Sequence, residues 1–540
     1  MRRSKISCVL AAALVAGVAG AASGQVRIAE WNITNYSSTS GRDAAFRTAL
    51  YGISDAVGAG NGLQFAPDII VVQEIIESIS GQTQQQAGNA SVAAFLGVLN
   101  TAVGSPADWL AAPYNVDNGD TGNAMFYRGS KFSLMGNTSL TTNTGTGPNQ
   151  APRDTGRWLV RLSGYTGVPA QLYLYGGHFK AGSSAADQLR RNPEGERIRL
   201  DANALADNAN FAVCADFNVQ NDSQVFYQYM VGNSGSPAFT SDASGRFFDP
   251  IIRPAVWENS NTYRFIHTQD QALAMDSRHD QILIAGNLRN GQGMDYLPFS
   301  TSGNIAAAWN LSTWNDINHS YRCWGNDGSS FNAVLNTSSN AMVGNTIATA
   351  LVNSAAGGGH LPVYLDLQVP AKIVAPASIA FGSVPVNSSA QVNIQVSNGA
   401  NLALWSKDGT GRGIDVLNYS MAASSGFTAP GGSFADTVGG GVNSHFISMN
   451  TSSPGPKAGT LTITSDDADT PVLVINITGT VTSQPDYDVN NDGSVDIEDL
   501  YAWVAGNTDV DGSGTVTAAD GVALRGELRS GETPDITIGR

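Results

Sequence analysis

Residues 68–74 read DIIVVQE, a run of four branched apolar residues that ends in a glutamine and a carboxylate. Branched apolar side chains in succession favour a buried strand. A carboxylate at the end of such a strand costs free energy unless a cation or hydrogen-bond donors compensate its charge. The stretch therefore predicts a strand that delivers Glu74 to a site with a positively charged partner.

Further apolar runs in the first 372 residues also carry polar residues at one end. The runs are VRIAEWN ending at Asn32, LYLYGGH ending at His178, FAVCADFN ending at Asp216 and Asn218, DQILI beginning at Asp280, and HLPVYLDL beginning at His360. If these runs are strands, their polar ends can gather along one rim of a sheet, where binding sites commonly lie. Helix-like stretches such as GRDAAFRTALYGISDAV alternate with them, a pattern that predicts an α/β fold.

The donors in these runs favour a hard cation. Glu74, Asp216 and Asn218 offer oxygen ligands of the kind that magnesium, manganese and calcium prefer. Clusters of cysteine are absent from the sequence, so zinc is less favoured.

The order WN, QE, HFK, DFN, RHDQIL and HLPV, from Trp31 to Leu367, resembles the endonuclease/exonuclease/phosphatase superfamily. Each pair alone is a weak signal, but six elements in this order form a specific one. The resemblance implies a four-layered α/β/β/α sandwich over residues 25–372. It also implies hydrolysis of phosphate esters with Mg²⁺ or Mn²⁺.

The resemblance assigns roles to two groups of oxygen donors. Glu74 matches the principal metal ligand, and Asn32 matches the asparagine that helps to hold that metal site. Asp216 and Asn218 match the pair that orients the nucleophile and binds phosphate or metal.

The histidines of the pattern supply proton transfer. His178 matches the histidine that contacts phosphate or assists the leaving group, and Asp280 matches the acid that pairs with the final histidine, His360. A carboxylate beside imidazole favours the charged ring that forms when histidine takes a proton from water. The candidates for binding the substrate are Lys180, Tyr127 and Arg157.

One position departs from the pattern. The family has Asp immediately before the final histidine, whereas this chain reads GGGH with Gly359 in that place. An orienting or metal-binding carboxylate is missing, and Asp276 and Asp366 are too displaced in sequence to be assigned as replacements.

The net charge of the chain bears on which substrate it can bind. The chain carries 29 basic and 45 acidic residues, and a surface of this balance repels nucleic acid unless cations gather locally. We expect an extracellular endonuclease acting on DNA or RNA. The alternatives are a phosphodiesterase for a small or lipid headgroup substrate, of the sphingomyelinase kind, and a non-catalytic surface adhesin.

The first residues, MRRSKISCVLAAALVAGVAGAASGQ, have a basic start, an apolar run and small residues suited to cleavage near Ala22 or Gly24. This pattern predicts an export signal over 1–24 and a soluble mature protein that is secreted or periplasmic. Two cysteines then remain, Cys214 and Cys323. A bridge between them and two free thiols are both compatible with the sequence.

After the proline-containing linker VPAKIVAPAS, the composition changes. Residues 376–482 contain short β-branched segments such as QVNIQVSN and PVLVINITGTV, separated by Gly, Ser, Asn and Asp. This predicts a β-sandwich, and the segments resemble the immunoglobulin-like modules of bacterial surface proteins. We expect a spacer without catalytic residues.

Residues 486–540 contain an internal repeat, DVNNDGSVDIED and DVDGSGTVTAAD. Each copy places oxygen donors at positions 1, 3, 5 and 12 of an EF-hand loop, with glycine at position 6. The unit resembles dockerin-type modules, which attach proteins to a partner on a cell surface or in a secreted complex. A calcium-stabilised cap without a partner is the alternative. The predicted calcium ligands are Asp488, Asn490, Asp492, Ser494 and Asp499 in the first loop and Asp509, Asp511, Ser513, Thr515 and Asp520 in the second.

Overall fold

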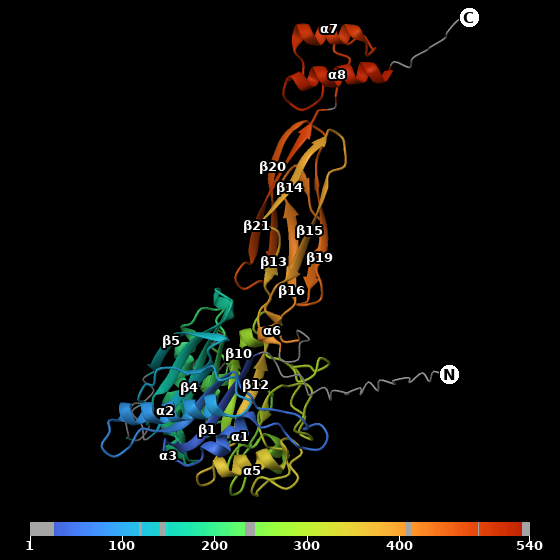
Figure 1. The fold of residues 1–540 in the computed structure, drawn as a ribbon. Helices are drawn as coiled ribbons and strands as arrows, with labels where there is room; N and C mark the ends of the chain where they lie inside the picture. Colours follow the sequence, from blue (N-terminus) through green and yellow to red (C-terminus); the bar gives the residue numbers. More distant parts are fainter. Residues whose placement is uncertain are drawn as a thin grey trace, which may run out of the picture. The chain divides into compact units, whose positions relative to one another are not determined.

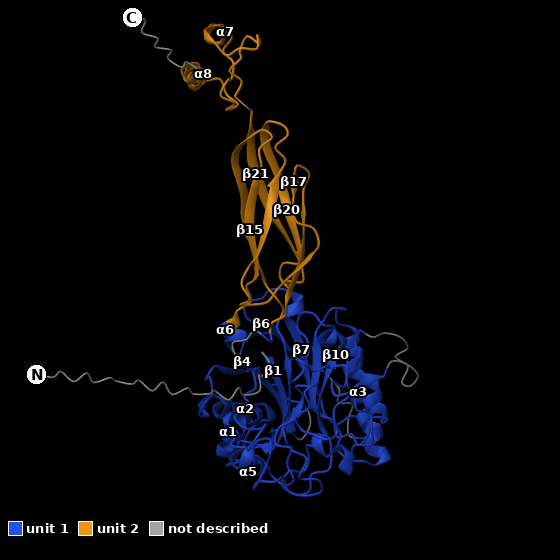
Figure 2. Cartoon of the chain, turned by 90° about the vertical axis from the view of Figure 1, so that its right-hand side faces the viewer, with its two compact units in different colours: residues 1–369, 403–413 blue, residues 370–402, 414–540 orange. Residues whose placement is uncertain are grey.

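The computed structural model describes residues 26–117, 121–140, 147, 150–232, 244–406, 412–483 and 485–531. The expected export signal lies outside these ranges. The chain divides into two compact units, coloured separately in Figure 2. Unit 1 comprises residues 1–369 with 403–413, and unit 2 comprises 370–402 with 414–540. Each unit is described by itself.

The first sheet of unit 1, sheet A, has the strand order β11-β12-β1-β2-β4-β3 (Figure 1). β1 pairs in parallel with β2 and antiparallel with β12, and β2 pairs antiparallel with β4. The strands are β1 (Val26–Tyr36), β2 (Ile69–Ile76), β3 (Trp109–Ala111), β4 (Thr121–Arg128), β11 (Arg322–Cys323) and β12 (Val363–Leu367).

The second sheet of unit 1, sheet B, has the order β5-β6-β7-β8-β10-β9. β7 and β8 are parallel, and β10 runs antiparallel to β8. The strands are β5 (Phe132–Leu140), β6 (Thr155–Leu162), β7 (Gln171–His178), β8 (Phe211–Asp216), β9 (Phe247–Phe248) and β10 (Asp280–Ala285).

Helices cover the outer faces of both sheets. α1 and α2 lie on one side of the paired sheets and α3 on the other (Figure 2). The helices of unit 1 are α1 (Asp43–Tyr51), α2 (Gln84–Thr101), α3 (Ala185–Asn203), α4 (Val225–Val231) and α5 (Gly344–Ser354), with short 3-10 turns η1 (Val168–Ala170), η2 (Asn261–Ile266) and η3 (Gly286–Arg289). The described part of unit 1 is therefore a mixed α/β fold with two packed sheets, as the sequence predicts.

The close packing of the two sheets depends on small residues in β7. A Cβ at Gly176 would lie 2.6 Å from Cγ1 of Val71 in β2 and 2.6 Å from the ring of Trp158 in β6. The side chain of Gln73 reaches across and donates to the carbonyl of Cys214 at 3.3 Å. This contact between β2 and β8 brings the ends of their strands to one place.

Cys214 and Cys323 are not bridged. Cys214 and Cys323 are both buried and free, and burial raises the pKa of each thiol. Among the described residues, the structure also contains no helix of the length and apolarity that a membrane crossing requires.

Unit 2 contains a β-sandwich whose sheets have the orders β13-β15-β19-β17 and β14-β21-β20-β16-β18. Alternating side chains of both sheets form its core, including Ile394, Tyr419, Ile447 and Ile475. Its strands are β13 (Ile373–Val374), β14 (Ser378–Pro385), β15 (Gln391–Asn398), β16 (Leu417–Ala423), β17 (Phe427–Thr428), β18 (Ser433–Asp436), β19 (Asn443–Met449), β20 (Gly455–Ser465) and β21 (Val472–Thr482).

Two further helices, α7 (Ile497–Gly506) and α8 (Ala518–Gly531), each follow one copy of the internal repeat. Gly493 and Gly514, at position 6 of the two loops, have φ of +91° and +85°, which lies in the region that favours glycine. The repeated loops therefore turn where the sequence predicts.

Residues 403–413 belong to unit 1, although the chain on both sides of them belongs to unit 2. They begin within the four-residue helix α6 (Leu402–Trp405). The indole of Trp405 is buried, packs edge-on against Phe132 at a ring distance of 6.1 Å, and lies 5.5 Å from the ammonium of Lys131.

Candidate active site

β1 carries the first side chain of the site, Asn32, and β2 carries the second, Glu74. A bulge interrupts the pairing of β2 after Val72, and Glu74 has φ of +62°, a left-handed conformation that a non-glycine residue adopts only when its surroundings hold it. The Asn32 amide in β1 donates to Glu74 Oε1 at 2.8 Å, and the backbone N–H of Asn35 donates to Oε2 at 2.9 Å. The Glu74 carboxylate is thus aimed away from the regular pleat and fixed.

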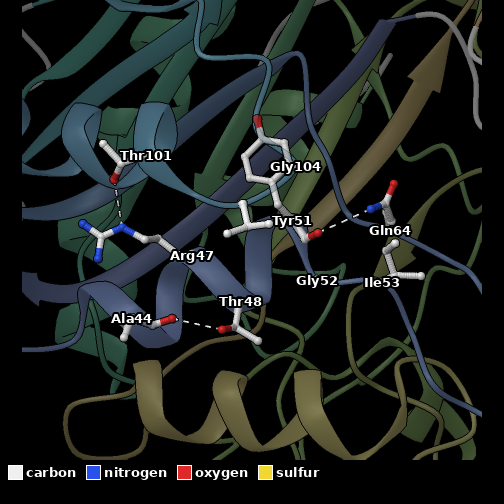
Figure 3. Close-up of a pocket in the computed structure, with 10 residues that line it drawn as sticks. Ala44, Arg47, Thr48, Tyr51, Gly52, Ile53, Gln64, Thr101 and Gly104 are labelled. Carbon is white, nitrogen blue, oxygen red and sulfur yellow. Dashed lines mark hydrogen bonds between the residues drawn. The ribbon is translucent and has the colours of Figure 1, made fainter.

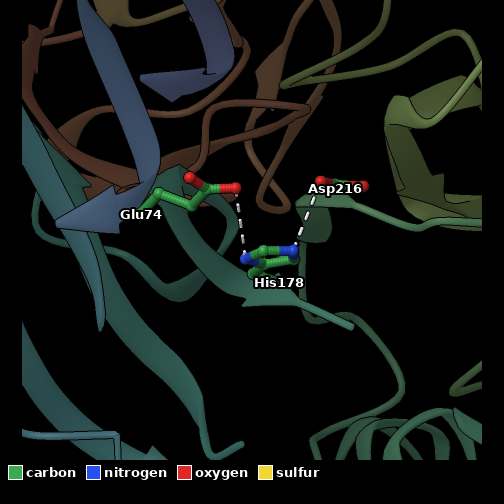
Figure 4. Close-up of side chains that lie close together, drawn as sticks. All are labelled: Glu74, His178 and Asp216. Atoms are coloured by element: carbon green, nitrogen blue, oxygen red, sulfur yellow. Dashed lines mark ion pairs between the residues drawn. The ribbon is translucent and has the colours of Figure 1, made fainter. Parts of the chain in front are cut away.

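β7 and β8 end side by side in sheet B, with His178 opposite Asp216. His178 Nδ1 lies 3.9 Å from Glu74 Oε1, and Nε2 lies 3.5 Å from Asp216 Oδ2, so the ring stands between the two carboxylates (Figure 4). The amide of Asn32 also donates to Asp216 Oδ2 at 3.0 Å. Ends of strands from both sheets therefore meet in one cluster.

Asn218 lies beside this cluster, with φ of +51°. Its backbone N–H donates to Asp216 Oδ1 at 3.1 Å, and its side-chain amide donates to the carbonyl of Phe179 at 3.2 Å. The side chain is 5% exposed. Asn218 therefore fixes the turn that presents the Asp216 carboxylate.

Asp280 and His360 complete the cluster. Asp280 begins β10 directly opposite Asp216, and His360 precedes β12 by three residues. His360 Nδ1 lies 2.9 Å and 3.1 Å from the two carboxylate oxygens of Asp280, which is fully buried. His360 Nε2 lies 4.0 Å from Asp216 Oδ2. The pairing of an acid with the final histidine is thus present in the geometry.

The two histidines differ in charge. Burial lowers the pKa of His178 well below its usual value, and the nearby cations Arg153 and Lys180 lower it further. Burial also disfavours the charged form of His360, but the carboxylates of Asp280 and Asp216 outweigh it and raise the pKa of the ring to about 10. At neutral pH and without a cation, His178 is neutral and His360 is an imidazolium.

The carboxylates at the site are crowded. Glu30, two residues before Asn32 in β1, is fully buried, and both of its oxygens lack a hydrogen-bond partner. Burial first, and then repulsion from Asp280 and Asp216, raises the pKa of Glu30 well above its usual value. Burial and Asp280 likewise raise the pKa of Asp216. Burial and mutual repulsion thus disfavour the ionised acids, and a divalent cation would relieve that repulsion.

The donor set fits such a cation. One ligand atom from each of Glu74, His178 and Asp216 lies within 4.8 Å of the others, and Asp216, Asp280 and His360 form a second group of the same size. Carboxylate oxygens dominate both groups, as magnesium and manganese sites require. Glu74, with a side chain 14% exposed, is the carboxylate of the cluster that solvent reaches most readily.

Two of the predicted substrate contacts lie elsewhere. Tyr127 in β4 pairs opposite Ile69, five residues along β2 from Glu74, or about 16 Å at ~3.3 Å per residue. Arg157 Nη1 donates to both carboxylate oxygens of Asp201 of α3, at 2.7 Å and 2.6 Å, on the helix-covered face of sheet B. Neither is part of the cluster, because Tyr127 lies too far along the sheet and Arg157 is held by Asp201.

The third predicted substrate contact, Lys180, lies at the edge of the cluster. Its ammonium pairs with Asp187 Oδ1 at 2.8 Å, and its charge lowers the pKa of His178. Its side chain is 21% exposed. A phosphate at His178 would compete with Asp187 for this ammonium.

Two residues that the sequence interpretation did not select belong to the site. Glu30 was detectable as a carboxylate inside the apolar run VRIAEW, the same signal that selects Glu74. Gln269 places its Nε2 at 3.3 Å from Nε2 of His360. It comes from the long irregular segment between β9 and β10, where the sequence gives no periodicity to place it.

The repeat loops hold a separate set of carboxylates. In the second loop, ligand atoms of Asp509, Asp511 and Asp520 lie within 4.8 Å of one another. In the first loop, the Asp499 carboxylate accepts from the N–H groups of Asn490 and Asp496 at 3.1 Å and 2.8 Å. Both loops therefore fold their acidic side chains inward.

A surface pocket of about 550 Å³ lies apart from the cluster (Figure 3). Residues of α1 and of the segments after α1 and α2 line it, among them Arg47, Tyr51, Ile53 and Val103. The guanidinium of Arg47 donates to Thr101 at 3.0 Å. None of the cluster's side chains reaches this pocket.

The chain was compared with protein families, curated proteins and solved structures, and only solved structures are similar to it. No protein-family model and no curated protein matches the sequence. Among solved structures, the chain is similar to the human Nocturnin catalytic domain, with 13% identity over 64% of this chain and 94% of that chain and a TM-score of 0.33. It is also similar to TDP2 of D. rerio complexed with a single-strand DNA product, with 12% identity over 64% and 99% and a TM-score of 0.33.

An endonuclease/exonuclease/phosphatase from Beutenbergia cavernae has 12% identity over 84% of this chain and 99% of that chain, with a TM-score of 0.32.

Proposed function

We propose that this protein is a secreted phosphodiesterase of the endonuclease/exonuclease/phosphatase superfamily that depends on a divalent metal and hydrolyses DNA or RNA. The observation that supports the proposal is the convergence of Glu74, His178, Asp216 and the Asp280–His360 pair at strand ends of two sheets. These residues are separated by up to 286 positions in the chain, and they meet in one largely buried cluster that contains three carboxylates.

Glu74 and Asp216 would hold the cation, with Asn32 fixing both carboxylates through its amide. A bound Mg²⁺ or Mn²⁺ would neutralise charge on the phosphate and stabilise the charge that develops in the transition state. Positive charge at this place would also offset the carboxylates that raise the pKa of His360, which favours the neutral ring.

The neutral ring of His360 would take a proton from the attacking water at Nε2, while Asp280 holds Nδ1–H and stabilises the imidazolium that forms. His178, whose neutral ring is favoured, would donate an N–H to a phosphate oxygen or to the leaving oxygen. Asn218 would hold the Asp216 carboxylate in position. Lys180 would exchange Asp187 for a phosphate oxygen.

A second candidate is a phosphodiesterase for a small or lipid headgroup substrate. The position of Arg157 favours it, because its pairing with Asp201 leaves one cation fewer to bind the phosphates of a nucleic-acid strand. A third candidate, a non-catalytic adhesin, draws support from Gly359 in place of the expected Asp.

One assay separates the three candidates. Purified protein is incubated with plasmid DNA, RNA, sphingomyelin and a chromogenic phosphodiester, in Mg²⁺, in Mn²⁺ and in chelator. Metal-dependent nicking or RNA cleavage supports the nuclease. Turnover of the lipid or of the chromogenic ester alone supports the second candidate, and inactivity on every substrate in both metals contradicts an enzyme.

We further propose that the two repeat loops bind calcium and that residues 486–540 attach the protein to a partner on a cell surface or in a secreted complex. The inward-facing carboxylates of Asp499, Asp509 and Asp520 support the first part. The exposed apolar side chains of Ile497, Tyr501 and Val504 support the second, because they recur at helical spacing on α7. Calorimetric titration with Ca²⁺ tests the loops, and a chain ending at residue 483 tests attachment to cells.

A further inference from the structure

The space that the side chain of an aspartate at position 359, directly before His360, would occupy is already filled. Gly359 has φ of +73°, and a Cβ there would lie 2.3 Å from the Cβ of Ala355 and 2.9 Å from Nε2 of Gln271. Such separations are shorter than real contacts, so no side chain fits at this position with the present backbone. Another part of the chain must hold His360 in place.

That part is the segment 268–272. The N–H of Leu361 donates to the carbonyl of Thr268 at 2.8 Å, and the N–H of Ala272 donates to the carbonyl of Gly358 at 2.9 Å. The side-chain amide of Gln271 donates to the carbonyl of His360 at 2.9 Å. These bonds hold the backbone on both sides of the histidine.

Gln269, in the centre of this segment, reaches the imidazole ring itself. Its Nε2 lies 3.3 Å from Nε2 of His360, on the side of the ring opposite to the bond with Asp280. Its backbone is fixed by Ser277, with the Gln269 N–H donating to the Ser277 carbonyl at 3.2 Å and the Ser277 N–H donating back at 3.2 Å. The amide is therefore presented to His360 from an anchored backbone.

We infer that Gln269 is a positioning residue that replaces the missing side chain at 359: with Asp280 it holds the ring of His360 from both nitrogens in the resting site, and it releases the Nε2 lone pair when the attacking water binds there. An amide suits this task for a chemical reason. Its NH₂ group donates to a bare Nε2, and after a half-turn its oxygen accepts from Nε2–H, so the ring stays held whether or not it carries the proton.

Only the turnover test of this inference rests on the proposed function. The contact of Gln269 with the His360 ring can be measured by NMR without any substrate. The variants are Gln269→Met, which keeps the length and removes the amide, and Gln269→Asn, which keeps the amide and shortens its reach by one carbon. Leu273→Ala is the matched control, since Leu273 lies in the same segment with its side chain 59% exposed. Thermal unfolding checks that all variants fold.

The first measurement is NMR of the metal-free protein with isotope-labelled histidine, the His360 signals being assigned with a His360→Asn variant. Both Gln269 variants should shift or broaden the Nε2 signal of His360, while Leu273→Ala leaves it in place. Coincident His360 signals in wild type and both Gln269 variants would overturn the inference.

The second measurement is steady-state turnover of the preferred substrate. Loss of one orienting hydrogen bond should lower kcat by about tenfold in both Gln269 variants, with KM within about twofold of wild type. Unchanged kcat in a variant whose His360 signals have moved would also overturn the inference. Shifted His360 signals in a protein that hydrolyses no substrate would support the hold on the ring and contradict the proposed function instead.

Discussion

The buried cluster of unit 1 and the repeat loops of unit 2 both gather carboxylates, but they do so by opposite means. Asp216 and Asp280 are buried at strand ends, and the surrounding fold holds them although they lie 64 positions apart. The loop carboxylates lie within twelve consecutive residues and are held mostly by N–H groups of their own loop. A cluster assembled by a whole fold persists without its cation, whereas a cluster assembled by one loop depends on it.

The sharpest test of the buried cluster is Glu74→Gln, which keeps the shape and removes the charge. We expect at least about a thousandfold loss of kcat/KM on the preferred substrate, because the cation loses its principal carboxylate. Asp207→Asn, an exposed carboxylate on the surface, is the matched control. Near-normal rates for Glu74→Gln at saturating Mg²⁺ would remove Glu74 from the mechanism.

Chelation should separate the two regions next. We expect removal of Ca²⁺ to raise the rate of limited proteolysis within 486–531 by about tenfold or more, while unit 1 keeps its unfolding temperature. Asp520→Ala should reproduce the effect in the presence of Ca²⁺, since its carboxylate accepts from Val510, Asp511 and Thr517. Equal protection of both regions in chelator would contradict the comparison.

The charge of His360 predicts a pH dependence for unit 1 alone. The pKa of its ring is raised from 6.5 to about 10 in the folded protein. The ring therefore adds stability that is fully present below pH 6.5 and is lost as the pH rises toward 10. Chemical denaturation of chelated protein should show this loss, on the order of a few kcal/mol, and Asp280→Asn should abolish it. If the free energy of unfolding depends on pH in the same way in Asp280→Asn, other titratable groups cause that dependence.

Restoring the expected carboxylate should harm the protein. Gly359→Asp is expected to lower the free energy of unfolding by about 1–3 kcal/mol without raising turnover, because its Cβ meets Ala355 and Gln271. Gly357→Asp is the matched control, since Gly357 has a similar φ of +74° with open space around it. Higher activity in Gly359→Asp would show that the backbone adapts.

The smallest effect is expected for Arg157→Gln. Its ion pair with Asp201 is partly exposed, so stability should fall by less than about 1 kcal/mol. Turnover should stay within about twofold, because the guanidinium lies on the far side of sheet B. A tenfold loss of turnover would place Arg157 in the substrate path after all.

Strand ends explain which parts of the site could be predicted from the sequence. Glu74 and His178 each close an apolar run, and such runs define both the strand and the rim that its end reaches. Tyr127 and Arg157 lie within strands, where a side chain's partner depends on which face it occupies and on what covers that face. That information comes only from the pairing of strands.

The long segment between β9 and β10 shows a second limit. Gln269 lies in a stretch with little regular structure, and its contact with His360 joins residues 91 positions apart. No local pattern encodes such a contact. The Gly359 departure indicated that something was missing, but only the packing of Ala355 and Gln271 shows that the space is already taken.

The assignment of residues 403–413 to unit 1 affects where unit 1 can be cut from the rest of the chain. A protein cut after residue 372, where the composition changes, would lack the indole of Trp405 and leave the ring of Phe132 without its partner. Recombinant fragments that contain unit 1 should therefore extend past the β-sandwich to residue 483. Low solubility of a shorter fragment would result from the missing tryptophan and not from a defect in the cluster at the strand ends.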